Sequence, residues 1–161
     1  MFPTFARILV LPGLALVATT LPGHAIEVAK SAAVAALPAK VWQTVGDFCG
    51  IGTWHPAVEK CVVSQKDGKT LRTLSLKGGG TIVEEQVSRD DKVMTYTYAI
   101  VESPLPVSDY TSTLSVSPSD SGSKLDWKGS FKAKGAPDSV ATDVISGIYD
   151  AGLKGIADKA K

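Results

Sequence analysis

The spacing of apolar residues changes along the chain, and each spacing predicts a different kind of element. From residue 61 to residue 134, apolar and polar residues alternate, which is typical of strands with one buried face. Short polar or glycine-rich segments interrupt the alternation, among them Asp67-Gly68, a pair that favours a tight hairpin turn. The pattern therefore predicts an antiparallel meander with strands over 61–65, 70–77, 81–88, 93–101, 109–116 and 124–134.

Helical spacing lies on both sides of this meander. After a first strand predicted over 26–37, Pro38 and the apolar residues behind it predict a helix over 38–48, followed by a second short helix or turn over 54–60. From Asp138 to Ile156, apolar residues recur at helical spacing and predict one long amphipathic helix. Because the apolar face of the meander must be covered, we expect an α+β fold in which about seven curved antiparallel strands wrap around the C-terminal helix.

The first 25 residues have a different character from the rest. Arg7 is their only charged residue, residues 8–21 are almost wholly apolar, and Gly23-His24-Ala25 places small residues at the −3 and −1 positions of a cleavage site. This order is typical of a secretory signal peptide. We therefore predict cleavage after Ala25, a periplasmic protein and one domain over 26–161, with an uncleaved anchor helix as the alternative. No later stretch is long and apolar enough to span a membrane.

The composition, 44% hydrophobic and 20% charged, fits a globular domain. With 17 basic and 16 acidic residues the formal net charge is +1, so the sequence offers no broad basic surface for nucleic acid. His24 would leave with the signal peptide, and the remaining His55 cannot build a multi-histidine metal site. No metal and no cofactor is therefore expected.

Cys49 and Cys61 are the only cysteines. In an exported protein, two cysteines suggest a disulfide, which would close a loop of about 13 residues worth about 3 kcal/mol. Free or redox-active thiols, and a metal pair with His55, are the alternatives.

Two short motifs carry polar groups of chemical interest. In Trp54-His55-Pro56, the histidine can act as a general base near neutral pH, or it can be a structural residue bonded to backbone at a cavity mouth. Trp54 would line that mouth or pack in the core. Glu84 and Glu85 point to opposite faces of their strand, and Glu85, between two valines, is the predicted inward anchor for a ligand.

The apolar face of the meander is rich in aromatic residues. These side chains form either a plain core or the lining of a pocket in which tyrosine hydroxyls orient a ligand. Glycines 147, 152 and 155 of the long helix indicate close packing on the sheet or room for a ligand beneath the helix. The candidate lining residues are Met94, Tyr96, Tyr98, Tyr110, Trp127 and Phe131, with Ile148 from the helix.

Several motifs occur together in an order that resembles a known family. They are Pro38-Ala-Lys-Val-Trp42, the segment 47–61, Tyr96-Thr-Tyr98, Pro106 with Tyr110, Trp127, and Tyr149-Asp-Ala-Gly152. The sequence resembles the helix-grip fold of the START-like, or SRPBCC, superfamily, which includes the Bet v 1 allergens. Within it, the chain looks most similar to the bacterial polyketide cyclase/dehydrase and lipid-transport group.

The resemblance implies a cavity between sheet and long helix that holds a hydrophobic or amphipathic small molecule or lipid. It also implies an alternative, because an exported member of the methanol-oxidation accessory type assists a periplasmic dehydrogenase–cytochrome pair, so a periplasmic redox enzyme is a second candidate partner. A cyclase- or dehydratase-like enzyme that uses His55, with Glu85 or a tyrosine, is the third reading.

Overall fold

The computed structural model describes residues 24–161, so the predicted signal peptide lies almost entirely outside the described residues. Seven strands and three helices follow one another in the predicted order. The elements are β1 (Ile26–Val34), α1 (Pro38–Val45), α2 (Ile51–Trp54), β2 (Val58–Lys66), β3 (Lys69–Leu76), β4 (Thr81–Asp90), β5 (Thr95–Glu102), β6 (Val107–Ser119), β7 (Gly122–Ala133) and α3 (Asp138–Lys159).

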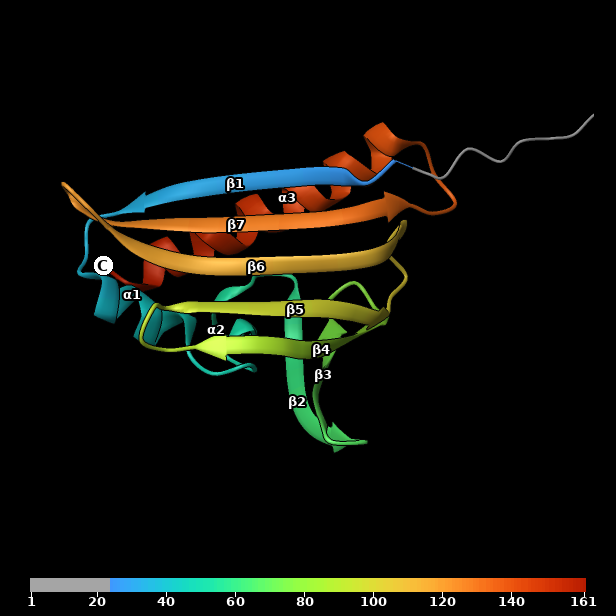
Figure 1. Cartoon of the computed structure of the whole chain (residues 1–161), viewed down its shortest axis with the longest axis horizontal. Coiled ribbons are helices and arrows are strands. Elements are labelled where there is room, and N and C mark those ends of the chain that lie inside the picture. Colours follow the sequence, from blue (N-terminus) through green and yellow to red (C-terminus); the bar gives the residue numbers. More distant parts are fainter. Residues whose placement is uncertain (1–23) are drawn as a thin grey trace, which may run out of the picture.

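The strands form one antiparallel sheet in the order β1-β7-β6-β5-β4-β3-β2. Strands β2 to β7 therefore form a meander, and β1 pairs with β7 at the edge opposite β2. Figure 1 shows α3 running behind β1 and β7, and the β2–β3 hairpin turning away from the direction of the other strands. The sheet is thus strongly twisted, and α3 covers its concave face. The predicted α+β arrangement is confirmed.

Local sequence explains most of the observed elements. Along β7, buried and more exposed residues alternate as predicted, with Leu125, Trp127 and Phe131 facing the core. Asp67 and Gly68 both have positive φ, at 52° and 76°, which the tight turn between β2 and β3 requires. The same hairpin pairs Lys66 with Lys69.

The short helices differ from their predicted bounds. Helix α1 ends at Val45 rather than at residue 48, because Gly46 takes a φ of 72° and stops the helix. The second helix covers 51–54 instead of 54–60. His55 already has an extended backbone, as expected for a residue before proline, and the chain enters β2 at Val58.

Two glycines let α3 lie unusually close to its neighbours. A methyl group on Gly152 would stand 2.5 Å from Cζ3 of Trp127 and 2.9 Å from Cδ2 of His55, and one on Gly155 would collide with the Trp54 carbonyl oxygen. Gly147 faces open space. Close packing therefore explains two of the three helix glycines.

Within residues 24–161, no helix combines the length and apolarity that a membrane span requires. In the same part of the chain, no three His, Cys, Asp or Glu side chains are grouped in a way that could hold a metal ion.

Candidate functional site

A cavity of about 290 Å³ lies between α3 and the concave face of the sheet. Its walls are mostly apolar, and β3, β4, β5 and α3 supply most of them; among these side chains are Leu74, Leu76, Ile82, Ile100, Val144 and Ile148. Five residues bring polar atoms to the wall, namely His55, Glu84, Tyr98, Tyr110 and Trp127. Such a concave apolar space with few polar groups is typical of a small-molecule site.

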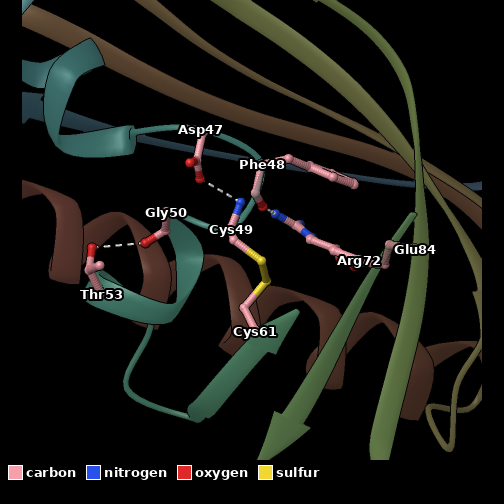
Figure 2. The surroundings of a disulfide bond; sticks show 8 residues. All are labelled: Asp47, Phe48, Cys49, Gly50, Thr53, Cys61, Arg72 and Glu84. Carbon is pink, nitrogen blue, oxygen red and sulfur yellow. Dashed lines mark hydrogen bonds and ion pairs between the residues drawn. A yellow bond between two sulfur atoms is a disulfide. The ribbon is translucent and has the colours of Figure 1, made fainter. Parts of the chain in front are cut away.

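A buried ion pair stands at one side of this cavity. Arg72 on β3 and Glu84 on β4 are cross-strand partners, and the Arg72 Nε donates to Glu84 Oε2. Arg72 is 0% exposed and Glu84 is 5% exposed. The Arg72 Nη1 also donates to the Phe48 carbonyl oxygen, and its guanidinium lies 4.2 Å from the centroid of the Phe48 ring (Figure 2). The pair therefore links the sheet to the loop that follows α1.

Burial and pairing oppose each other at these two groups. Burial raises the pKa of Glu84, and the neighbouring Arg72 charge partly offsets that rise. Burial alone would lower the pKa of Arg72, but Glu84 and two tyrosines raise it, so the guanidinium stays charged. Removing one partner would leave the other charge buried and uncompensated.

The prediction that Glu85 points inward is wrong. Glu85 lies on the opposite face of β4, where its carboxylate pairs with Lys69 at 2.9 Å in a partly exposed position. Glu84, which shares the face of Ile82, lines the cavity instead. Valines flank Glu85 on its own face, but that face is the outer one, and Val87 is 54% exposed.

A chain of hydroxyl groups crosses the wall next to Trp127. The Ser112 hydroxyl donates to the Lys128 carbonyl oxygen at 2.8 Å and lies 2.8 Å from the Tyr149 hydroxyl. Tyr149 contacts Tyr110 at 2.6 Å, and Tyr110 contacts the next hydroxyl, that of Tyr98, at 3.2 Å. Burial raises the pKa of Tyr149 to about 12 and raises those of Tyr98 and Tyr110 well above the ordinary value, so all three hydroxyls stay protonated.

His55 is held by two backbone groups. Its Nδ1 accepts a hydrogen bond from the Ala57 N–H at 3.2 Å, so the proton of the neutral ring is on Nε2, which donates to the Ile148 carbonyl oxygen at 3.1 Å. Burial, more than the opposing bond to Ile148, lowers the pKa of His55. Both ring nitrogens are occupied in the neutral form, an arrangement that favours the structural reading of His55 over the general-base one.

The Cys49–Cys61 disulfide is present, with the two Cα atoms 5.5 Å apart. It joins the loop after α1 to β2, and Asp47 Oδ1 accepts from the Cys49 N–H at 2.8 Å (Figure 2). The bridge encloses α2 and His55. It therefore anchors the segment that supplies one wall of the cavity.

The structure brings five of the predicted ligand-binding residues to the cavity and leaves five elsewhere. His55, Tyr98, Tyr110, Trp127 and Ile148 line it. Trp54, Tyr96 and Phe131 are buried in the surrounding core, Met94 is partly buried beside that core, and Glu85 is on the outer face. Trp54, for example, donates from Nε1 to the Val45 carbonyl oxygen at 3.0 Å and packs edge-on against Trp127.

The sequence reasoning missed Arg72 and Glu84. A signal was present, because Arg72 is in phase with Leu74 and Leu76 on a strand whose apolar residues must face inward. An inward arginine needs a buried acceptor, and the neighbouring strand offers Glu84.

Known proteins match this chain over most of its length. A family model described as polyketide cyclase/dehydrase and lipid transport matches residues 25–161. A solved uncharacterised protein from Bacillus thuringiensis is 28% identical, with a TM-score of 0.74 over 85% of this chain and 98% of that chain. The protein XoxI from Bacillus cereus is 30% identical, with a TM-score of 0.73 over 84% of this chain and 94% of that one.

The crystal structure of Ara h 8.0201 is similar in fold. It is 21% identical, with a TM-score of 0.67 over 85% of this chain and 98% of that chain. Together with the seven-stranded antiparallel sheet and the C-terminal helix, this likeness identifies the Bet v 1-like helix-grip fold.

Proposed function

The chain belongs to the polyketide cyclase/dehydrase and lipid-transport family, and we propose that it is an exported protein which binds a small hydrophobic or amphipathic molecule. The observation that carries this proposal is the apolar cavity of about 290 Å³ between α3 and the sheet. Burying an apolar ligand there is favourable by about 25 cal/mol per Å² removed from water.

The geometry at His55 favours binding over catalysis. A general acid or base must reach the reacting group with a free lone pair or proton. The two nitrogens of His55 are instead engaged with Ala57 and Ile148. The role of accessory to a dehydrogenase–cytochrome pair stays a prediction that rests on the sequence resemblance.

The disulfide supports the export part of the proposal. Disulfides persist mainly in oxidising compartments such as the bacterial periplasm. The bridge between Cys49 and Cys61 is therefore compatible with the cleavage after Ala25 that the sequence predicts.

A cavity-filling variant tests the binding proposal. Ile148 lines the cavity from α3, so Ile148→Trp should occupy the space that a ligand needs. Val140 lies two turns earlier on the same helix, is 46% exposed and does not line the cavity, so Val140→Trp is the matched control.

Binding of naphthalene, a neutral apolar probe, would be measured by isothermal titration calorimetry. We expect wild type and Val140→Trp to bind, and Ile148→Trp to lose at least about tenfold in affinity. Equal binding by all three proteins would place the probe outside the cavity and contradict the proposal.

A further inference from the structure

We propose that the cavity selects neutral ligands that carry a hydroxyl or a similar uncharged hydrogen-bond donor, and that it discriminates against carboxylates. This inference rests on the proposed function, because it names the class of molecule that the same cavity would bind. It follows from which polar atoms of the wall are already occupied and which one is not.

The ring N–H groups of His55 and Trp127 already donate hydrogen bonds within the protein. His55 donates from Nε2 to the Ile148 carbonyl oxygen. Trp127 donates from Nε1 to the hydroxyl oxygens of Tyr98 and Ser112, at 3.1 and 3.0 Å. A ligand that presents only acceptors would have to break one of these bonds to gain its own.

The tyrosine hydroxyl protons are also committed, and their direction is determined. Ser112 must donate to the Lys128 carbonyl oxygen, which is only an acceptor, so Tyr149 donates to Ser112. Tyr110 then donates to Tyr149, and Tyr98 donates to Tyr110. Each hydroxyl proton therefore has its own acceptor, and none is left over for a ligand.

The strongest acceptor at the wall, the Glu84 carboxylate, has one oxygen left for a ligand. Glu84 uses Oε2 for the bond from Arg72, and among the described residues no donor reaches its Oε1. Glu84 is one of the residues that line the cavity, and it is 5% exposed. A ligand hydroxyl can therefore gain a bond to a carboxylate oxygen without breaking any existing bond, and hydrogen bonds to charged acceptors are stronger than neutral ones.

The charges at the wall disfavour an anion. The carboxylate of Glu84 faces the cavity, whereas Arg72 is fully buried and is not part of the lining. Arg72 donates from Nε to Glu84 and from Nη1 to the Phe48 carbonyl oxygen. Its Nη2 is buried, finds no partner among residues 24–161, and belongs to a residue that is not part of the cavity lining. A ligand carboxylate would lose its hydration shell in the cavity and would be repelled by the like charge of Glu84.

The volume of the cavity determines how large a suitable probe molecule can be. At about 30 Å³ for each water-sized group, 290 Å³ corresponds to about ten non-hydrogen atoms. Naphthalene derivatives are of this size. We would compare 2-naphthol, a neutral donor, with 2-methoxynaphthalene, which lacks the donor, and with 2-naphthoate, which is an anion.

Isothermal titration calorimetry on the wild-type protein at neutral pH gives the first test. We expect 2-naphthol to bind on the order of tenfold or more tightly than 2-methoxynaphthalene, and 2-naphthoate to bind more weakly than either. Equal affinity for the naphthol and its ether, or preferred binding of the naphthoate, would overturn the inference while leaving the binding function in place. If none of the three binds, the proposed function itself fails.

Variants then assign the effect to the carboxylate. Glu84→Gln removes the negative charge and leaves Arg72 without its counter-ion, so it should lose the preference for 2-naphthol and gain affinity for 2-naphthoate. Glu85→Gln changes the neighbouring glutamate on the outer face and should bind all three probes as the wild type does. A wild-type preference order in Glu84→Gln would contradict the role assigned to Glu84.

Glu84→Gln leaves the buried charge of Arg72 uncompensated and could prevent folding. The double variant Arg72→Met with Glu84→Leu avoids this problem, since replacing a whole buried ion pair by apolar residues is often tolerated. We expect it to bind 2-naphthol and 2-methoxynaphthalene equally. A retained preference for 2-naphthol would show that another group binds the hydroxyl, and would overturn the inference.

Discussion

Substituting two glycines of α3 separately tests the packing of this helix on the cavity wall. Gly147 and Gly152 lie on the same helix, and alanine at either position removes the entropic cost of glycine, which is about 0.5–1 kcal/mol. A methyl group on Gly147 meets no atom of the described residues within 4 Å, so Gly147→Ala should stabilise the protein by about that amount. At Gly152 the surrounding side chains reverse the sign of the expected stability change.

A methyl group at Gly152 would stand 2.5 Å from Trp127 Cζ3 and 2.9 Å from His55 Cδ2, whereas carbon atoms pack best at about 3.5–4.0 Å. Trp127 cannot easily give way, because it is buried, stacks on Tyr149 with ring centroids 4.6 Å apart, and donates its N–H to two hydroxyls. Overpacking of this kind costs about 1–3 kcal/mol. Gly152→Ala should therefore be destabilising by about 1–2 kcal/mol in spite of the better helix propensity.

Urea denaturation followed by tryptophan fluorescence measures both variants against wild type. With a slope of about 1–3 kcal/mol per M, we expect the unfolding midpoint to rise by about 0.2–1 M for Gly147→Ala and to fall by about 0.3–2 M for Gly152→Ala, at unchanged slope. If Gly152→Ala proved as stable as Gly147→Ala, the close approach of α3 to Trp127 and His55 would be refuted.

Three further predictions concern export, the disulfide and His55. N-terminal sequencing of the exported protein should begin at Ile26, and a full-length product held in the membrane would contradict this. Replacing Cys49 and Cys61 by alanine should lower the free energy of unfolding by about 2–4 kcal/mol in urea denaturation, and an unchanged midpoint would count against the bridge. Because the folded-state pKa of His55 lies below 6.5, its contribution to stability is present above about pH 6.5 and is lost as the pH falls from there towards the folded pKa. The difference in unfolding free energy between wild type and His55→Gln should therefore shrink across that window, and a difference independent of pH would refute the neutral, buried ring.

The number, type and order of the main elements could be predicted from local sequence. Alternation along 124–134 places Trp127 inward on β7, and helical spacing from Asp138 onward predicts α3. These signals are local because each depends on the backbone geometry of consecutive residues. The pairing of the only two cysteines could be predicted for a similar reason, since it required no choice among partners.

Glu84 and Glu85 show where local pattern was insufficient. Glu84 is in phase with Ile82, and Glu85 is in phase with Val83 and Val87. In addition, β-bulges between Val83 and Glu84 and again after Gln86 disturb the pairing of β4 with β5. What decides the inward residue is the cross-strand partner, Arg72, on β3. That contact joins residues 12 positions apart and depends on strand register rather than on either strand alone.

His55 and the helix glycines depend on still more distant contacts. The role of His55 is set by the Ile148 carbonyl oxygen, 93 residues away in the sequence, and the difference between Gly147 and Gly152 is set by Trp127 on β7. Local periodicity and residue chemistry suffice to predict the order of the strands, the long helix and the disulfide. Which polar atoms of the cavity wall are already bonded could not be read from the sequence, because each of those bonds forms between groups that the folded sheet and helix bring together.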